Sequence, residues 1–235
     1  MGDQYKAQSN ATEDLVVVFG PRTALARQVL SSRWAEQKNL MIVARNQEEA
    51  KWAHNFLPRA AVLACWLPQD QWTWPAACRR VTVLLCGFGI IHPVAPVWAS
   101  HCQTMTRDAE VLTRVVQRFQ QQTINVVLVS SICAWALTPE RAYYTGWKCL
   151  AEALVRNAVS TQERARLSVL YPGRLVNQKT LRRPLSFLHT SYSRLSRRLI
   201  RIAQSSQTHS KIVGLDARML LLLRTLGCIS NAVFK

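Results

Sequence analysis

The 235-residue sequence lacks several features that would assign it to a membrane, secreted or repeat class. It has no internal repeat and no low-complexity tract, and no apolar run approaches the roughly 18 residues of a bilayer span. Its first 15 residues, MGDQYKAQSNATEDL, show no charged-then-apolar secretion signal. The seven cysteines have no paired spacing, which indicates buried thiols in a reducing compartment. We therefore expect a cytoplasmic protein.

Acidic residues are scarce as well. The chain has 13 Asp and Glu against 30 Lys and Arg, a formal net charge of +17. From Arg164 onward there are fourteen Lys or Arg and one acid, Asp216. This excess favours an anionic partner such as nucleic acid, anionic lipid or an acidic substrate. Nucleic acid is the least expected of these, because the sequence has no interleaved aromatic and basic platform, no finger spacing and no recognition-helix signature.

Metal ligands are not grouped. The five histidines are scattered, and although His92 and His101 lie near Cys102, no fourth group completes a ligand set. We expect no metal site.

The apolar runs that are present alternate with amphipathic segments. Runs at 15–19, 40–44, 61–65 and 81–86, followed by INVVLVSS and RLSVLYPG, predict six strands. Helices are predicted after Gly20, near 47–55, near 106–120 and from about Tyr144 to Val159. Continuous apolar strands alternating with helices are typical of a parallel sheet covered on both faces. The predicted fold class is α/β, a doubly wound Rossmann-type parallel sheet in a three-layer α/β/α arrangement.

We divide the chain into a flexible N-terminus (1–13), a Rossmann-type dinucleotide-binding and catalytic core (14–180) and a basic, leucine-rich C-terminal segment (181–235). The last segment is expected to cover the substrate pocket and to contact a membrane surface. It contains one apolar stripe with four arginines opposite it: Leu188, Tyr192, Leu195, Leu199 and Ile202 against Arg194, Arg197, Arg198 and Arg201. Two interpretations stay open, a core-packed helix with a solvated basic face and a helix lying on anionic lipid. The apolar run Met219 to Leu223, between Arg218 and Arg224, adds to the second.

One cluster of residues has the pattern of a proton-transfer site. Tyr144 and Lys148 are four residues apart on a predicted helix, so they project from one face. A phenol near pKa 10 is a weak acid at neutral pH, and a neighbouring ammonium is expected to lower that pKa by roughly one to three units. Ser131, at the carboxyl end of the fifth strand, would hold a substrate oxygen at the rim where such folds bind ligands.

These residues resemble the short-chain dehydrogenase/reductase family over about residues 15–180. VVLVSS followed by YTGWK is similar to the family's Ser and Tyr-x-x-x-Lys arrangement, and YPGRL is similar to its Pro-Gly segment after the sixth strand. The resemblance implies that Ser131 orients the substrate carbonyl, that Tyr144 is the acid or base, and that Lys148 lowers its pKa and binds the cofactor ribose. It also implies that Pro172 and Gly173 line the nicotinamide side.

The glycine-rich cofactor motif is eroded. The family's first turn is replaced by FGPRTALA, which keeps Gly20 but has Ala24 and Ala26 at the later glycine positions. Each added methyl narrows the approach of a pyrophosphate to the helix N-terminus. The family's Asn-Asn-Ala-Gly segment is replaced by CGFG, which keeps a close backbone approach at Gly87 and Gly89.

Three further positions depart from the family. The asparagine of its proton relay and the acid after its third strand have no match, and Asn177 stands where a threonine is common. By resemblance, Asn177 is still a cofactor contact.

The resemblance also bears on the choice of cofactor. Arg45 follows the second strand, where an acid would bind the ribose hydroxyls of NAD, and a guanidinium there suits a 2′-phosphate. Arg22 in the first turn adds a second cation. We therefore favour NADP(H) over NAD(H).

The leading hypothesis is an NADP-dependent oxidoreductase that transfers hydride to a carbonyl or from an alcohol, on a small, hydrophobic or lipid-linked substrate. The alternative is a non-catalytic Rossmann-fold pseudoenzyme that binds a protein partner or a membrane surface through its basic face. A homo-oligomer is also expected from the family. Val111, Val115 and Phe119 would suit helix pairing between subunits, and core packing explains them equally well.

Overall fold

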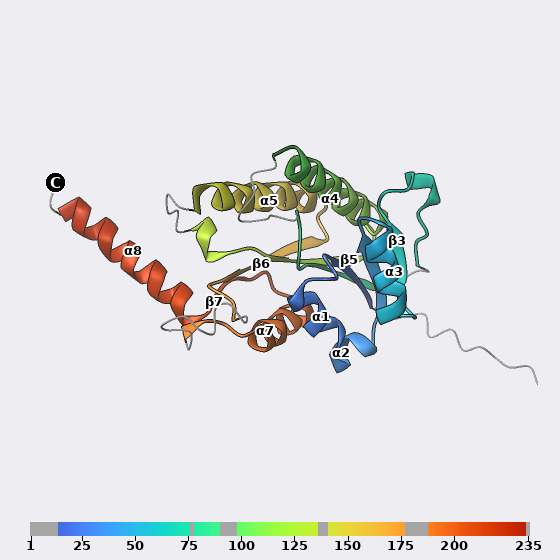
Figure 1. The fold of residues 1–235 in the computed structure, drawn as a ribbon, viewed down its shortest axis with the longest axis horizontal. Helices are drawn as coiled ribbons and strands as arrows, with labels where there is room; N and C mark the ends of the chain where they lie inside the picture. Colours follow the sequence, from blue (N-terminus) through green and yellow to red (C-terminus); the bar gives the residue numbers. More distant parts are fainter. Residues whose placement is uncertain (1–13, 76–77, 90–97, 136–140, 177–187, 234–235) are drawn as a thin grey trace, which may run out of the picture.

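The computed structural model describes residues 14–75, 78–89, 98–135, 141–176 and 188–233, without the side chains of residue 98 and residues 226–233. A parallel sheet runs through the centre of the molecule (Figure 1). Its seven strands are β1 (Leu15–Phe19), β2 (Asn39–Ala44), β3 (Ala61–Ala64), β4 (Arg80–Leu85), β5 (Thr123–Val129), β6 (Ala165–Pro172) and β7 (Ser210–Val213). The six predicted strands are all present, and β7 is an addition.

The strands are ordered β3-β2-β1-β4-β5-β6-β7, and all the paired strands are parallel. The order reverses between β1 and β4, which places a topological switch point at their carboxyl ends. The predicted α/β doubly wound fold is therefore confirmed.

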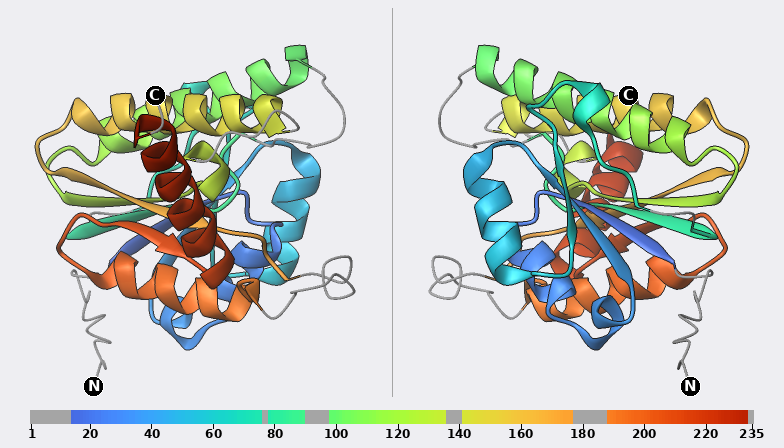
Figure 2. Two further views of the ribbon diagram at one scale, coloured as in Figure 1. Left: turned by 90° about the vertical axis from the view of Figure 1, so that its left-hand side faces the viewer. Right: turned by 90° about the vertical axis from the view of Figure 1, so that its right-hand side faces the viewer.

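Helices cover both faces of the sheet in three layers (Figure 2). One face carries α4 (Trp98–Arg118) and α5 (Ala142–Ser160), and the other carries α1 (Ala24–Leu30), α2 (Arg33–Glu36), α3 (Gln47–Phe56) and α7 (Tyr192–Gln204). Two short 3-10 helices, η1 (Gln69–Gln71) and η2 (Ile132–Ala134), lie in connections, and α8 (Leu215–Val233) ends the chain.

Alternation along β1 shows why both faces are apolar. Val17 and Phe19 join the core cluster under α4 and α5, whereas Val16 and Val18 join the cluster under α1 and α7. Successive side chains of a strand point to opposite faces, so a strand covered on both sides needs an unbroken apolar run. Such runs were the signal that predicted these strands.

The last third of the chain contributes to this core. On α7 the apolar stripe is buried through Leu195, Leu199 and Ile202, which pack with α1 against the sheet. The core-packed interpretation therefore holds for α7, because its apolar side is not free to enter a bilayer. Arg194, Arg197 and Arg201 are exposed on the opposite side.

Helix α4 also packs inward. Val111, Val115 and Phe119, the residues considered for pairing between subunits, are at most 4% exposed and belong to the core under α4 and α5. They are explained by the subunit's own core, so they give no support to the expected homo-oligomer.

Candidate active site at the carboxyl edge of the sheet

A crevice of about 790 Å³ opens at the carboxyl ends of β4, β5 and β6. It is lined by Thr23, Ala24, Leu25, Cys86, Val129, Ser130, Ser131, Ile132, Cys133, Arg141, Tyr143, Tyr144, Lys148, Pro172, Gly173, Arg174, Leu175 and Tyr192. The lining includes three cations, Arg141, Lys148 and Arg174, and no carboxylate among the described residues. A crevice of this charge suits an anionic ligand such as a dinucleotide.

The predicted serine and tyrosine meet in this crevice. Ser131 follows β5, where its Oγ accepts a hydrogen bond from the N–H of Cys133 at 3.3 Å and begins η2. Tyr144 lies in the first turn of α5 and lines the same crevice as Ser131. Burial raises the pKa of Tyr144, and the nearby hydroxyl of Ser131 opposes that rise without cancelling it.

Lys148 lies one turn after Tyr144 on the same face of α5. Its Nζ is 5.7 Å from the centre of the Tyr144 ring. Burial lowers the pKa of Lys148 to about 8, and the carboxylate of Glu152 works against that fall. The expectation that the ammonium would lower the pKa of the tyrosine is not met, because burial dominates and the pKa of Tyr144 is raised.

Glu152 is a residue of this site that the sequence reasoning missed. Its Oε1 accepts a hydrogen bond from Ser130 Oγ at 2.5 Å, and its Oε2 accepts one from the Tyr171 hydroxyl at 2.9 Å. The side chain of Glu152 is only 13% exposed, with Arg156 3.8 Å away at the surface. The carboxylate thus ties the ends of β5 and β6 to α5, next to Lys148. The four-residue spacing of Tyr144, Lys148 and Glu152 on one helix face is the sequence signal that would have identified it.

The glycines at the switch point are needed for contacts within the backbone. Gly20 follows β1 with φ of +66°, and a Cβ on it would lie 2.6 Å from the Cα of Gly87. Gly87, after β4, would in turn place a Cβ 2.9 Å from the side chain of Thr23. Two loops that cross this closely leave no room for a side chain at either position. Neither glycine is among the residues that line the crevice.

Arg45 lies in a different setting from the one assumed. Its guanidinium is buried, donating to Asp108 through Nε at 3.0 Å and Nη2 at 2.7 Å, and to the carbonyl oxygen of Gly87. Asp108, on α4, is fully buried and also accepts a hydrogen bond from the N–H of Gly89 at 2.7 Å. Binding a 2′-phosphate would require Arg45 to leave these partners.

The other predicted cofactor residues divide between the crevice and its surroundings. Ala24, Pro172 and Gly173 line the crevice, whereas Ala26 lies on the fully buried side of α1. Arg22 is exposed, 3.5 Å from Glu48 on α3. Asn177 lies outside the described residues.

No protein-family model and no curated protein sequence matches the chain. Its structure does match solved proteins over almost its whole length. A short-chain dehydrogenase from Streptomyces avermitilis is 13% identical, with 96% of each chain covered and a TM-score of 0.66. A short-chain dehydrogenase from Burkholderia cenocepacia in complex with NADP is 12% identical, with 95% of this chain and 96% of that one covered and a TM-score of 0.63.

A short-chain type dehydrogenase/reductase from Mycobacterium ulcerans, at 15% identity and a TM-score of 0.61, covers 88% of this chain and 90% of its own. The chain therefore has the fold of the short-chain dehydrogenase/reductases, which confirms the resemblance stated from its motifs. At these identities the likeness establishes the fold, and the chemistry has to be argued from the crevice.

Proposed function

We propose that the protein is an oxidoreductase of the short-chain dehydrogenase/reductase type, transferring hydride between NADP(H) and a carbonyl or alcohol carbon. The observation that supports this most is that Ser131 and Tyr144 line one crevice, with Lys148 one turn after Tyr144 on the same face of α5. The three groups come from β5 and α5 and meet in a cationic crevice at the carboxyl edge of the sheet.

The residues present fit the nicotinamide half of such a cofactor. Lys148, Pro172 and Gly173 line the crevice and would hold the nicotinamide and its ribose. When bound, the cofactor supplies or accepts the hydride. The protein's own groups handle the substrate oxygen and its proton.

In the reduction direction, the hydroxyl of Ser131 donates a hydrogen bond to the substrate carbonyl, and the phenol of Tyr144 gives that oxygen its proton. The raised pKa keeps Tyr144 protonated at neutral pH, which suits a donor. The ammonium of Lys148 then stabilises the phenolate left behind. With a pKa of about 8, Lys148 is mostly charged at pH 7 and loses that charge above pH 8.

Apolar side chains occupy much of the remaining lining. Leu25, Val129 and Ile132 face the crevice together with Leu175 and the ring of Tyr192. A lining of this composition supports a hydrophobic or lipid-linked carbonyl or alcohol as the substrate class.

The preference for NADP(H) has support of two kinds. The crevice has no carboxylate among its described lining residues to bind the ribose hydroxyls of NAD, and Arg22 stands at the start of α1. The Burkholderia protein of the same fold binds NADP. Arg22 is the more accessible of the two predicted cations, since Arg45 is held by Asp108.

Thermal melting with NADPH and with NADH tests this proposal. A ligand at a thousand times its Kd stabilises the folded state by about 4 kcal/mol, which raises Tm by several degrees. We expect a larger shift with NADPH than with NADH, and NADPH consumption with some member of a panel of hydrophobic aldehydes and ketones. An unchanged Tm with both cofactors would remove the proposal.

The bridge between Arg45 and Asp108 favours one alternative, a non-catalytic Rossmann-fold module. At the end of β2 the guanidinium of Arg45 is already hydrogen-bonded to Asp108 and is not free for a cofactor phosphate. The first turn also has alanines at two positions where the family has glycines. Such a module would keep the fold and bind a partner or a membrane through its basic surface. It predicts no Tm shift with either cofactor.

A further inference from the structure

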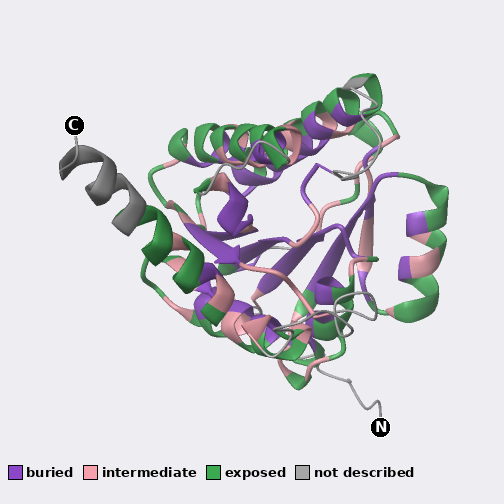
Figure 3. Cartoon of the chain, turned by 60° about the vertical axis from the view of Figure 1, so that its left-hand side comes forward, coloured by how far each residue is buried: buried purple, intermediate pink, exposed green. Residues whose placement is uncertain are grey.

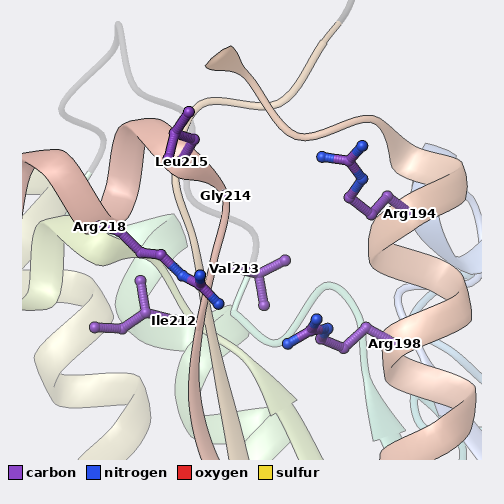
Figure 4. A pocket seen from close by; sticks show the side chains of 7 residues that line it. All are labelled: Arg194, Arg198, Ile212, Val213, Gly214, Leu215 and Arg218. Atoms are coloured by element: carbon purple, nitrogen blue, oxygen red, sulfur yellow. The ribbon is translucent and has the colours of Figure 1, made fainter.

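A second pocket, of about 390 Å³, lies between α7, β7 and the start of α8 (Figure 4). Its lining consists of Arg194, Arg198, Ile212, Val213, Gly214, Leu215 and Arg218. It shares no lining residue with the crevice. Three arginines from two helices therefore surround an apolar floor formed mainly by β7.

The three guanidinium groups are not neutralised by the part of the chain that the structure describes. No ion pair among the described residues involves Arg194, Arg198 or Arg218. The nearest acid in sequence, Asp216, directs Oδ2 to the N–H of Arg174 at 2.6 Å, on the side of the crevice. Three cations that repel one another around one pocket suit a shared anion, and a guanidinium matches the geometry of phosphate.

Helix α8 carries an exposed apolar surface beside this pocket. It leaves the body of the molecule beyond β7 (Figures 1 and 3). Its large side chains are unusually exposed, at 53% for Leu215, 45% for Met219, 37% for Leu220, 59% for Leu222 and 63% for Leu223. Exposed leucines next to arginines without an ion pair have the composition of an interfacial helix.

The combination points to one occupant. We propose that the arginine pocket and α8 dock the protein on an anionic bilayer, with a phospholipid phosphate among Arg194, Arg198 and Arg218 and the apolar side chains of α8 in the interface. Among the described helices none is long and apolar enough to cross a membrane, so α8 would lie along the surface. A free phosphate or a nucleic acid would leave the leucines of α8 in water.

Docking would also place the candidate active site near the lipid. The base of α8 is fixed through Asp216 to Arg174, which lines the crevice. At the other side, Arg224 on α8 donates a hydrogen bond to the carbonyl oxygen of Trp135, just after η2. The consequence, that a membrane-borne substrate reaches the crevice, rests on the proposed function, whereas docking itself does not.

Cosedimentation of the full chain with vesicles tests the docking without any turnover. The vesicles are phosphatidylcholine, with and without one third phosphatidylglycerol. We expect binding to the anionic vesicles, and a loss of about a hundredfold in the triple variant Arg194→Gln, Arg198→Gln and Arg218→Gln, from about fivefold for each cation. Thermal melting checks that the variant remains folded.

A matched triple variant controls for net charge. Arg79→Gln, Arg114→Gln and Arg118→Gln remove the same charge from exposed positions near β4 and on α4. We expect this variant to bind within about fivefold of the wild type, because its arginines lie away from the pocket. A second variant, Leu222→Ser with Leu223→Ser, keeps all the cations and is expected to weaken vesicle binding through its lost apolar contact.

Several outcomes would overturn the proposal. If the wild type did not bind anionic vesicles, the docking proposal would be wrong. If the two triple arginine variants lost vesicle binding equally, the effect would be one of overall charge and not of the pocket. Displacement from vesicles by millimolar inorganic phosphate would assign the pocket to a soluble anion. Duplex DNA that binds more tightly than the vesicles, and loses its binding in the pocket variant, would assign the surface to nucleic acid.

Discussion

The β2 end and the β5 end of the sheet's carboxyl edge differ in how their ionisable side chains are partnered. At the β2 end, Arg45 donates two hydrogen bonds to Asp108 and one to the carbonyl oxygen of Gly87, and its Nη1 lies 3.5 Å from the buried carboxylate of Glu49. At the β5 end, Tyr144 and Lys148 are half-buried with no ion pair of their own among the described residues, and partial desolvation moves the pKa values of both.

This difference separates a structural role from a chemical one. A buried ion pair whose partners are fully hydrogen-bonded holds segments together, here β2, the loop after β4 and α4. Ionisable groups kept buried with shifted pKa values, in a cleft, are the usual state of catalytic acids and bases. The contrast supports placing the proposed chemistry at the β5 end, and it gives the Arg45–Asp108 pair at the β2 end, which we call the brace, a structural role.

The largest effect is expected from Tyr144→Phe. Removing the hydroxyl eliminates the proposed proton donor, and general acid catalysis accounts for about a hundredfold to ten-thousandfold in rate. NADPH consumption in steady state measures the loss. The Tm shift given by NADPH should persist, because the ring remains in place. Unchanged turnover would remove Tyr144 from its proposed role.

Arg45→Ala tests the brace. The substitution leaves the carboxylates of Asp108 and Glu49 buried without the arginine, which is expected to cost about 3–5 kcal/mol in the free energy of unfolding. Urea denaturation measures it, and the double change of Arg45→Met with Asp108→Leu is expected to recover much of the loss. If Arg45→Ala instead lowered NADPH affinity at unchanged stability, the arginine would be a phosphate ligand as the sequence reasoning assumed.

The sequence predicted the features that depend on neighbouring residues and missed those that depend on residues far apart in the chain. The strands were predictable because an apolar run in a two-sided sheet is a local signal. Ser131, Tyr144 and Lys148 were predictable because the strand end and the helix face that carry them are local as well. The short strand β7 was missed, since Ser210–Val213 carries only two apolar residues.

The ion pair between Arg45 and Asp108 could not be predicted, because it joins two segments that are distant in the sequence. Arg45 and Asp108 are 63 residues apart and meet only when α4 packs beside β2 and β4. An arginine after the second strand looks like a phosphate ligand until its partner is known. The glycines show the same limit, because Gly20 and Gly87 are required by a contact between two distant loops.

Lys148→Met tests whether the charge of Lys148 lowers the stability of the folded protein. The pKa of Lys148 is about 8 in the folded protein, against an ordinary value of 10.5 that the unfolded chain retains, so the unfolded chain binds more protons between these values. Stability therefore rises with pH from about 8 to about 10.5, and below pH 8 the buried charge costs on the order of 2–3 kcal/mol.

The methionine removes that cost, so we expect Lys148→Met to unfold at a higher Tm than the wild type at pH 7 while losing turnover. Scanning calorimetry at pH 7 and pH 10 measures the difference, which should shrink at the higher pH. Lys51→Met, at an exposed position on α3, is the matched control and should show no such pH dependence. A fall in Tm for Lys148→Met would show that the ammonium is satisfied by a partner, as Arg45 is.

Glu152→Gln gives the smallest and most specific effect. The carboxylate raises the pKa of Lys148 against burial, so its neutral amide lets that pKa fall below about 8. Turnover that depends on the ammonium should then decline at a lower pH than in the wild type, with a few-fold loss at pH 8 and little change at pH 6. The amide can still hydrogen-bond Ser130 and Tyr171, so the fold is expected to hold.

Glu163→Gln, an exposed change just before β6, controls for charge. An unshifted pH profile would reduce Glu152 to a tie between β5, β6 and α5, the same kind of role that Asp108 has at the other end.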